Sequence, residues 1–288
     1  MLDLPGVVVP PEWLRRHLTA PDLLCCDVRW ALATGAERPA YAAGHIPGAV
    51  FIDLDRELAG PPGPTGRHPL PDPAAFAAAM RRAGAHPTST VVAYDAGTGA
   101  AARLWWLLRA AGHRRVAVLD GGFAGWLAAG GPVTTAVPDP APGTLGVAGF
   151  AGTVDADTAG ARAAAGTPVL DARAPERYRG LVEPIDPRPG HIPGARNLPW
   201  TELCDQGRLR PPAELRERFA ACGLPAPPVA ASATASAAVA YCGSGVTAAA
   251  LLLAMAHAGL PDGDLYPGSW SEWSRDPARP AATGPAGT

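Results

Sequence analysis

The residue with the clearest capacity for covalent chemistry is Cys242, which lies in the segment YCGSGVT at residues 241–247. Gly243 and Gly245 would let the loop curl so that backbone N–H groups converge on the sulfur. A helix that begins after the loop would add the positive end of its dipole. Both effects favour the nucleophilic thiolate over the thiol. We interpret Cys242 as a nucleophile, because a cysteine that only packs in a core needs no glycines to open the loop around it.

A cysteine followed by a glycine-bearing loop also occurs in cysteine phosphatases, and the sequence tests that class of enzyme. Those enzymes need an arginine six residues after the cysteine to bind phosphate. Position 248 is alanine here, and residues 249–253 are all Ala or Leu. Phosphoryl transfer without a cation at this place would lose its main electrostatic stabilisation. The sequence therefore argues against a phosphatase.

Two elements must position Cys242 at such a turn. Residues Ala237–Tyr241 predict a buried strand, and Ala248–Ala258 predict a helix with Gly259 as a C-cap. Elsewhere, short apolar runs at 90–94 and 116–119 alternate with a longer Ala- and Leu-rich run at 101–108. This alternation predicts an α/β fold with a mainly parallel sheet and helices on both of its faces.

The chain contains an internal repeat that fixes its organisation. Four landmarks recur in the same order at an almost constant separation: an Asp-x-Arg triplet at 27–29 and 171–173, GHIPGA at 44–49 and 190–195, VAYD at 92–95 matching VAYC at 239–242, and LDGG at 119–122 matching LYPG at 265–268. Such a repeat indicates two copies of one folding unit. Residues 137–143 are rich in Pro and lack apolar periodicity. We predict an N-terminal domain at 1–135, a linker at 136–153 and a C-terminal domain at 154–288.

Composition limits the partners and the compartment. A net charge of −2 and a hydrophobic fraction of 48% are typical of a globular protein, and there is no basic excess for binding nucleic acid. All 24 basic residues are arginines, so any anion site must use Arg or backbone N–H groups. No segment predicts a signal peptide or a membrane span. We expect a cytoplasmic protein.

The other cysteines give no sign of a disulfide framework. The sequence has five cysteines, an odd number, and no Cys-x-x-Cys pair that would indicate a zinc site. Cys25 and Cys26 lie in an apolar run and are expected to pack in a buried strand. No metal or organic cofactor is predicted. The Ala- and Gly-rich tail from Ala281 onward is expected to be disordered.

With these motifs in place, the sequence resembles the tandem-domain rhodanese-type sulfurtransferases, which include thiosulfate and 3-mercaptopyruvate sulfurtransferases. The resemblance covers nearly the whole chain and depends on the duplicated GHIPGA, the CGSGVTA loop at 242–248 and GSWSEW at 268–273. It implies two rhodanese-like domains and an active cysteine in the second one alone. Asp95 stands where Cys242 stands in the other copy, and a carboxylate cannot accept sulfur. The first domain is therefore expected to be non-catalytic and to cover the active site.

In this family, the residues after the cysteine correlate with the sulfur donor. CRKGVT loops accompany thiosulfate and CGSGVT loops accompany 3-mercaptopyruvate, so the resemblance implies mercaptopyruvate as donor. The physical argument agrees, because thiosulfate is a compact dianion that benefits from cations beside the sulfur. Ser244 offers a hydroxyl for the thiol proton of the donor, although a purely loop-forming serine is an equal alternative.

The donor carboxylate suits the planar, two-pronged guanidinium of arginine. By resemblance, Arg177 matches a substrate arginine of the family. Arg188 is a candidate for a second one, although its spacing from Arg177 is two residues longer than the resemblance leads us to expect and a solvated surface arginine is an alternative. Arg173 and Arg196 are interpreted as structural or exposed. The predicted substrate-binding set is Arg177, Arg188, Gly243, Gly245, Val246, Thr247 and His45.

His45 and His191 occupy equivalent places in the repeat, before an Ile-Pro-Gly turn. A turn-stabilising role is the simpler interpretation for His191. For His45 the resemblance implies a proton relay with an acidic residue and the loop serine, and Glu37 is the acidic residue nearest the expected place. Trp30 is expected either at the domain interface or in the core.

The resemblance implies a two-step reaction. Cys242 takes the outer sulfur of the donor as a persulfide, and a thiol or cyanide, with a thioredoxin-like reductant as a possible acceptor, then removes it. Two alternatives stay open: a thiosulfate:cyanide sulfurtransferase with the same cysteine, and, from another class, a redox sensor or a non-catalytic binding module.

Overall fold

The computed structural model describes residues 2–224 and 236–285. The chain divides into two compact units. Unit 1 comprises Met1–Gly60, Leu70–Ala151 and Gln206–Leu209, and unit 2 comprises Pro61–Pro69, Gly152–Asp205 and Arg210–Thr288. Unit 2 therefore includes a nine-residue segment, Pro61–Pro69, from the first half of the sequence.

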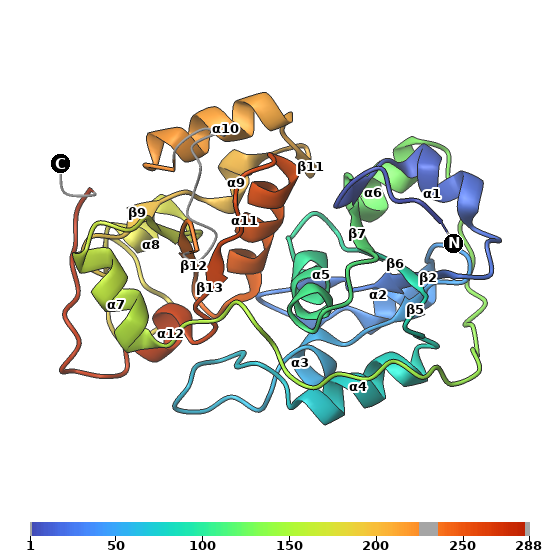
Figure 1. Ribbon diagram of the computed structural model, residues 1–288, viewed down its shortest axis with the longest axis horizontal. Helices are drawn as coiled ribbons and strands as arrows, with labels where there is room; N and C mark the ends of the chain where they lie inside the picture. The colour runs from blue at the N-terminus through green and yellow to red at the C-terminus, as the bar shows by residue number, and fades with distance from the viewer. Residues whose placement is uncertain (1, 225–235, 286–288) are drawn as a thin grey trace. The chain divides into compact units, whose positions relative to one another are not determined.

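The core of unit 1 is a five-stranded parallel sheet (Figure 1). Its strands lie in the order β1 (Val8–Val9), β7 (Val116–Leu119), β6 (Thr90–Tyr94), β2 (Leu23–Asp27) and β5 (Val50–Phe51). The central strand β6 is buried at all five positions. A strand buried on both faces reads as a continuous apolar run, which is why residues 90–94 were recognisable in the sequence.

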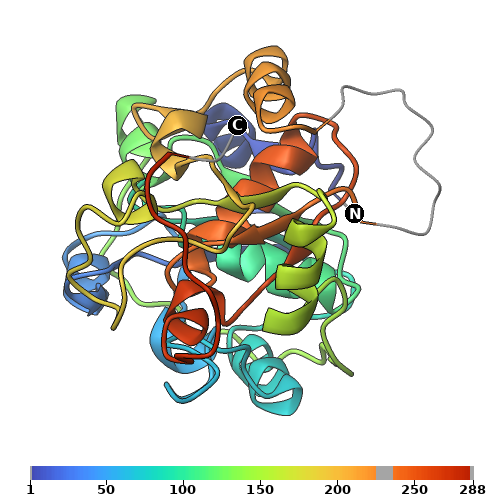
Figure 2. The same cartoon turned by 90° about the vertical axis from the view of Figure 1, so that its left-hand side faces the viewer.

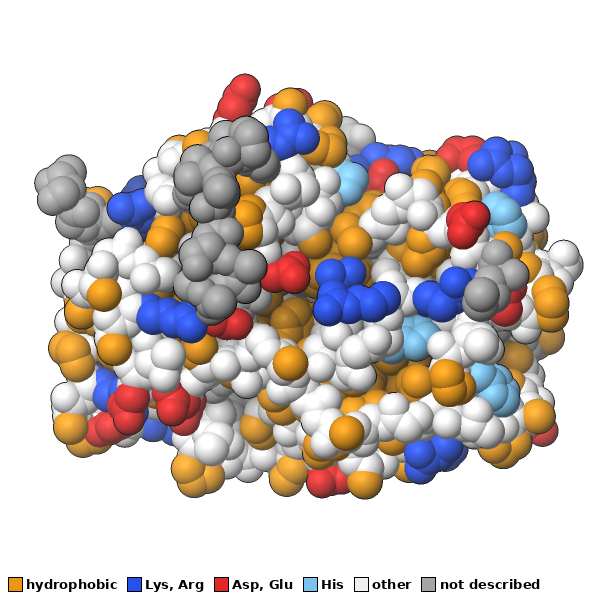
Figure 3. Space-filling view, viewed as in Figure 1, with side chains coloured by type: hydrophobic (Ala, Val, Ile, Leu, Met, Phe, Trp, Pro, Cys, Tyr) orange, Lys and Arg blue, Asp and Glu red, His pale blue; other side chains and the backbone are white. Residues whose placement is uncertain are grey.

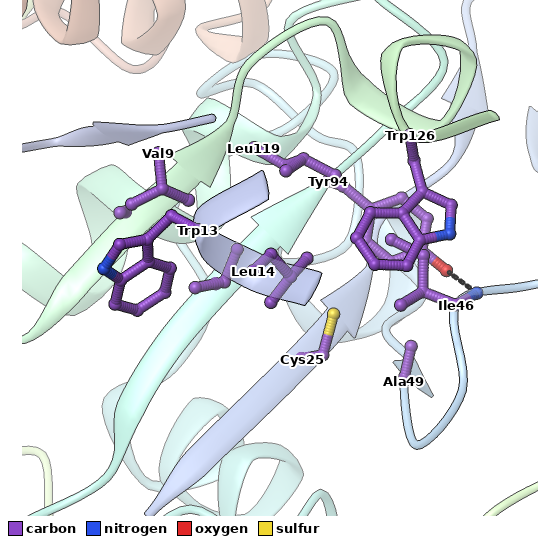
Figure 4. Close-up of a cluster of buried hydrophobic side chains, with 11 residues drawn as sticks. Val9, Trp13, Leu14, Cys25, Ile46, Ala49, Tyr94, Leu119 and Trp126 are labelled. Atoms are coloured by element: carbon purple, nitrogen blue, oxygen red, sulfur yellow. Dashed lines mark hydrogen bonds between the residues drawn. The ribbon is translucent and has the colours of Figure 1, made fainter. Parts of the chain in front are cut away.

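Helices cover both faces of this sheet. The helices of unit 1 are α1 (Pro11–His17), α2 (Arg38–Ala43), α3 (Leu54–Glu57), α4 (Pro73–Arg82), α5 (Ala101–Ala110) and α6 (Gly122–Ala128), and a small antiparallel pair is formed by β3 (Trp30–Ala31) and β4 (Gly35–Ala36). Trp13 of α1 and Trp126 of α6 pack with Val92 and Tyr94 on one face (Figure 4). Helix α5 contacts β6 and β7 and is buried from Ala101 to Leu108.

Unit 2 repeats this plan with a four-stranded parallel sheet (Figure 2). Its strands lie in the order β13 (Asp264–Leu265), β12 (Val239–Tyr241), β8 (Val169–Asp171) and β9 (Arg196–Asn197). Thr153 forms a parallel bridge with Leu265, at the place where β1 pairs with β7 in unit 1. The two sheets therefore share one strand order.

The helices of unit 2 are α7 (Ala156–Ala164), α8 (Pro175–Tyr178), α9 (Trp200–Leu203), α10 (Pro212–Ala221), α11 (Val246–His257) and α12 (Ser269–Trp273). The short strands β10 (Cys204–Asp205) and β11 (Arg208–Leu209) form a hairpin. Side chains of α7 and α12 pack with Val239 and Tyr241 in one apolar cluster, and α11 contacts β12 and β13. The predicted fold class, two tandem units with mainly parallel sheets and flanking helices, is confirmed.

The repeated motifs build the same interactions in both units. Arg173 pairs with Asp171 through Nη2 and Oδ2 at 2.7 Å, and Arg29 pairs with Asp27 in the same way at the same distance. Each arginine also donates to the carbonyl before the repeated histidine, Gly190 O or Gly44 O. The Asp-x-Arg triplets therefore tie the end of a central strand to the GHIPGA turn.

Several local predictions are confirmed. The strands expected at 90–94 and 116–119 are β6 and β7, and Cys25 and Cys26 are buried in β2. The expectation for the C-terminal tail is wrong as far as Gly284. Ala282 and His191 exchange two backbone hydrogen bonds, and Gly284 N donates to Arg179 O at 2.9 Å. Residues 286–288 lie outside the described residues.

Replacing Trp126 should destabilise unit 1, because this indole is fully buried and its Nε1 donates to Pro132 O at 2.8 Å. Trp126→Ala is expected to lower the free energy of unfolding by about 3–5 kcal/mol. Leu127→Ala is the matched control, since Leu127 is 49% exposed. Urea unfolding monitored by circular dichroism measures both variants, and equal midpoints would contradict the expected packing role.

Candidate active site

Cys242 lies between the end of the central strand β12 and the start of helix α11. The expected strand-to-helix turn is thus present, with Gly245 at the N-cap of α11 in the left-handed region (φ 79°). A glycine suits this position because other residues rarely adopt a positive φ. The Cys242 side chain is buried, with 2% exposure.

The sulfur of Cys242 faces backbone N–H donors of its own loop. Gly245 N donates to Sγ at 3.1 Å, and Ser244 N lies 3.4 Å from it. The first N–H groups of α11 follow directly and carry the positive end of the helix dipole. Donors and dipole both favour negative charge on the sulfur. Val246 and Thr247, two residues of the predicted binding set, form this first turn.

A second segment fixes the cysteine loop from outside. Ser269, at a strained positive φ of 54°, accepts a hydrogen bond from Cys242 N through its Oγ at 3.1 Å and donates to Tyr266 O at 2.9 Å. Trp270 N donates to Cys242 O, and Ser271 N donates to Gly243 O. Strain of this kind persists only where the surroundings impose it. The GSWSEW segment therefore holds the loop backbone in place.

The segment Pro61–Pro69 supplies a histidine to this loop. His68 Nδ1 lies 2.7 Å from Ser244 Oγ, a distance at which a hydrogen bond forms with either tautomer of the ring. Arg67 N donates to Ser271 Oγ at 3.1 Å, and a Cβ on Gly66 would lie 2.8 Å from Gly268 O. These contacts bind the segment closely to the loop-supporting residues, so that a serine and a histidine stand paired beside Cys242.

Two guanidinium groups approach Gly243, the residue after the cysteine. A Cβ on Gly243 would lie 2.8 Å from Nη2 of Arg67 and 3.4 Å from Nη1 of Arg177. Arg177 was expected near the site, whereas Arg67 was not. The residues that follow the cysteine in sequence, 248–253, supply no cation. In the folded protein, arginines from two other segments provide the positive charge.

Both arginines are paired with buried carboxylates. Arg177 Nη2 contacts Glu183 Oε1 at 2.6 Å and Asp186 Oδ2 at 2.9 Å, and Asp186 Oδ1 forms a close ion pair with Arg67 Nη1. Burial raises the pKa of the Asp186 carboxyl, an effect that the charge of Arg67 opposes and the charge of Glu183 reinforces. The two positive charges near Gly243 are thus largely neutralised.

Arg188 is placed differently from Arg177. Its guanidinium donates to four backbone carbonyls of the C-terminal segment: Ser274 O at 2.8 Å, Arg279 O at 3.0 Å, Trp273 O at 3.1 Å and Asp276 O at 2.7 Å. All three of its nitrogens are used in these bonds. The contacts favour a structural role for Arg188 over the predicted role in binding substrate.

His45 is likewise held by the fold of unit 1. Its side chain is fully buried, its Nδ1 lies 2.8 Å from Tyr41 O and its Nε2 lies 3.2 Å from Ala136 O. The ring stacks on Tyr41 at 3.9 Å between centroids, as His191 stacks on Tyr178 at 3.7 Å. Glu37 is the acceptor of a hydrogen bond from Thr34. The histidine that contacts Ser244 Oγ is His68 and not His45. We therefore assign the histidine position of the expected relay to His68, and Glu37 is not part of this contact.

Trp30 lies in unit 1 with 7% exposure, and its Nε1 donates to Asp55 Oδ1 at 2.9 Å.

The loop at Asp95 reproduces the loop at Cys242. Asp95 accepts hydrogen bonds from Gly97 N at 2.7 Å and Ala101 N at 2.8 Å. Burial raises the pKa of the Asp95 carboxyl, while these N–H donors lower it. The repeat thus preserves the cradle of N–H groups and places a different side chain in it.

Sequence reasoning missed Arg67, His68, Asp186 and Ser269. The pair Arg67-His68 follows the Gly- and Pro-rich run GPPGPTG at 60–66. Charged and titratable residues within a long connecting loop are a signal of function, because loops often carry binding and catalytic groups. Nothing local in the sequence shows which part of the fold that loop meets.

Metal sites and membrane spans are absent from the described part of the chain. No group of three or more His, Cys, Asp or Glu side chains in it is arranged to hold a metal ion. Among the described helices, none combines the length and the apolar character that a membrane span requires. On the face shown in Figure 3, arginines and carboxylates lie among apolar side chains.

Comparison with known proteins agrees with this architecture. The family model of the rhodanese-like domain matches residues 10–129 and 155–276. A protein of Pseudomonas aeruginosa named as a probable 3-mercaptopyruvate sulfurtransferase is 49% identical over 292 residues, with 95% of this chain and 96% of the relative covered. A protein of Mycobacterium tuberculosis, provisionally named thiosulfate sulfurtransferase SseB, is 43% identical over 273 residues, with 90% of each covered.

Solved structures agree as well. The crystal structure of SseA from Escherichia coli, described as a 3-mercaptopyruvate sulfotransferase with the rhodanese fold, has a TM-score of 0.79 and 35% identity, and 93% of this chain and 100% of that chain are covered. The duplicated parallel α/β unit, with a cysteine that faces backbone N–H groups in its second copy, is thus the fold of the rhodanese-like family. The chain belongs to the rhodanese-like family and is a sulfurtransferase, with a sulfur donor and a sulfur acceptor as its substrates.

The two arginines of the predicted binding set should respond differently to substitution. Arg177→Met should raise the KM for the sulfur donor about tenfold or more, because a charge-assisted contact is lost. Arg188→Met should instead lower the melting temperature while the donor KM changes little, because four carbonyls lose their donor. Steady-state kinetics and differential scanning calorimetry on both variants measure these effects. A large rise in KM for Arg188→Met at unchanged stability would restore its role in binding.

Proposed function

We propose that this enzyme transfers sulfur from 3-mercaptopyruvate to a thiol or cyanide acceptor through a persulfide on Cys242. The observation that carries the proposal is the pairing of Cys242 Sγ, held by Gly245 N at 3.1 Å, with a neighbouring Ser244–His68 hydrogen bond of 2.7 Å. The first feature suits a sulfur nucleophile. The second suits a donor whose sulfur carries a proton.

In the first step, the Cys242 thiolate attacks the thiol sulfur of the donor, and an S–S bond forms as the donor's C–S bond breaks. The thiol proton passes to the Ser244–His68 pair, and the enolate of pyruvate takes up a proton at carbon. The products are pyruvate and a cysteine persulfide. The negative charge on the sulfur of Cys242 lies next to the N–H of Gly245, and fixed dipoles of this kind lower the barrier of a step in which charge moves.

In the second step, an acceptor thiolate or cyanide attacks the outer sulfur, the S–S bond breaks and the Cys242 thiolate returns. This division into two half-reactions predicts ping-pong kinetics. A thioredoxin-like dithiol is a suitable acceptor, because its second thiol releases the transferred sulfur as sulfide. Such a reductant belongs to the cytoplasm, which we propose as the compartment.

The donor's carboxylate is assigned to the two guanidinium groups beside Gly243. Arg177 presents Nη1 to Gly243 while its Nε and Nη2 bond Glu183. Arg67 Nε is buried without a hydrogen-bond partner among the described residues, so it too can take a ligand. The remaining loop residues, Gly243 to Thr247, would contact the donor through backbone groups.

We retain the proposed division into an N-terminal non-catalytic domain at 1–135, a linker at 136–153 and a catalytic domain at 154–288. The argument for one silent domain is that Asp95 occupies the cradle of N–H groups in unit 1, where its oxygens accept the bonds that a sulfur receives in unit 2. Pro61–Pro69 adds two residues, Arg67 and His68, from the N-terminal half to the catalytic unit.

Thiosulfate is the second candidate donor, and the two arginines beside Gly243 are the observation that favours it. A dianion gains from cations close to the reacting sulfur. It carries no thiol proton, however, and would leave the Ser244–His68 pair without a task. This difference is the reason for placing mercaptopyruvate first.

Replacing the nucleophile tests the proposed reaction directly. Cys242→Ser should abolish pyruvate release from 3-mercaptopyruvate with a thiol acceptor, because a serine oxygen cannot carry sulfane sulfur. Cys204→Ser is the matched control, since Cys204 is a half-buried cysteine outside the loop. Pyruvate is measured by coupled lactate dehydrogenase. Turnover retained in Cys242→Ser would overturn the proposal, as would turnover lost in both variants.

The proton-relay role of Ser244 and His68 is tested by a double-mutant cycle. Ser244→Ala and His68→Gln should each lower kcat for mercaptopyruvate by about 10²–10³. Because the two groups act as one hydrogen-bonded unit, the double variant should be little slower than either single one. The exposed His86→Gln is the control. Additive losses, or equal losses with thiosulfate as donor, would count against a relay.

A further inference from the structure

The loop between α8 and the second GHIPGA motif places a carboxylate between the two arginines of the active site. Asp186 Oδ1 pairs with Nη1 of Arg67, and its Oδ2 lies 2.9 Å from Nη2 of Arg177. The Asp186 side chain is 3% exposed, whereas those of Arg67 and Arg177 are 19% and 14% exposed. The acid is thus more deeply buried than the bases that it bridges.

The geometry divides each guanidinium into two working sides. Nη1 of Arg67 and Nη2 of Arg177 contact Asp186. The nitrogens nearest to a Cβ placed on Gly243 are Nη2 of Arg67 at 2.8 Å and Nη1 of Arg177 at 3.4 Å, with Nη2 of Arg177 farther away at 3.9 Å. A bridging carboxylate between two planar guanidiniums fixes their orientation as well as their charge. The nitrogens left over point toward the loop that carries Cys242.

The charges of the connected network balance. Within the described residues it contains three guanidiniums, Arg67, Arg173 and Arg177, and three carboxylates, Asp171, Glu183 and Asp186. A neutral network binds a single negative charge through hydrogen bonds, without a large excess of positive potential. A dianion would need an uncompensated cation to offset its desolvation. Neutrality therefore disfavours the more highly charged donor.

On this basis, and taking the proposed sulfurtransferase reaction as its premise, we infer that Asp186 is a specificity-determining residue: its carboxylate bridges Arg67 and Arg177 and selects a monoanionic carboxylate donor over dianionic thiosulfate. Asp186 touches no reacting atom. It acts through the two arginines, whose net charge it sets. The cysteine loop alone does not exclude thiosulfate, because the arginines that could receive a dianion are present.

The burial of Asp186 supports this role independently. Loss of hydration raises the pKa of its carboxyl, and nearby Glu183 raises it further. A carboxylate kept at such a place is costly to desolvate, and the ion pairs with both arginines offset that cost. A carboxylate that only oriented one arginine would contact that arginine alone, whereas Asp186 contacts both Arg67 and Arg177.

The test compares kcat/KM for thiosulfate and for 3-mercaptopyruvate in wild type and in Asp186→Asn, which removes one charge and keeps the shape. The ratio of kcat/KM for thiosulfate to kcat/KM for mercaptopyruvate should rise about tenfold or more. Asp157→Asn, the same change at a side chain that is 85% exposed on α7, should leave the ratio unaltered. Asp186→Glu, which retains the charge, should keep the ratio near that of wild type.

Arg67→Gln provides the opposite change and covers the case in which Asp186→Asn does not fold. It makes the network more negative and should lower the same ratio by a similar factor. A merely structural role for Asp186 predicts that both donors lose kcat/KM equally, and that result would overturn the inference. Pyruvate release by the wild type in the same assays tests the proposed function separately. If the wild type releases pyruvate but the ratio of the two kcat/KM values is the same in all variants, the inference about Asp186 fails and the proposed function stands.

Discussion

The contact between a single sulfur atom and the backbone N–H groups that surround it is the interaction on which the rest of the site depends. Cys242 Sγ can receive these donors only because Gly245 turns the chain at a positive φ and α11 begins at the next residue. Ser269 pins Cys242 N from the other side. The strands that lead into the cysteine loop and into the GSWSEW segment, β12 and β13, are paired in the buried sheet. The surroundings of the sulfur are therefore set by the fold and not by the cysteine alone.

The internal repeat shows how one cradle can serve two purposes. In unit 1 the carboxylate of Asp95 fills it and accepts hydrogen bonds from two backbone N–H groups. The loop donors are thereby paired, and the loop carries no sulfur nucleophile. In unit 2 the sulfur of Cys242 fills it and accepts the N–H of Gly245. The Asp-x-Arg pairs and the stacked Tyr–His pairs are common to both units and are structural. The features without a counterpart, Ser244 with His68 and Asp186 with its arginines, are those that we assign to function.

Local features of the sequence were sufficient for much of this picture. The buried strands 90–94 and 116–119 and the turn at Cys242 follow from apolar runs and glycines, because their causes lie within a few residues. The expected roles of His45 and Arg188 were less well founded, since the partners of a side chain are set by tertiary contacts. His68 reaches Ser244 across 176 positions of the chain, and Arg67 meets Asp186 across 119. No periodicity encodes such pairings, so the charge balance around Gly243 emerged only from the folded structure.

The central step of the proposed reaction is the covalent binding of sulfur by Cys242. The most direct measurement is the intact mass of the reduced enzyme after brief exposure to 3-mercaptopyruvate without acceptor, with peptide mapping of the modified residue. The account predicts a gain of one sulfur atom, located on Cys242 and removed by cyanide. Pyruvate release with no sulfur adduct on Cys242, or adducts of oxygen alone, would contradict it.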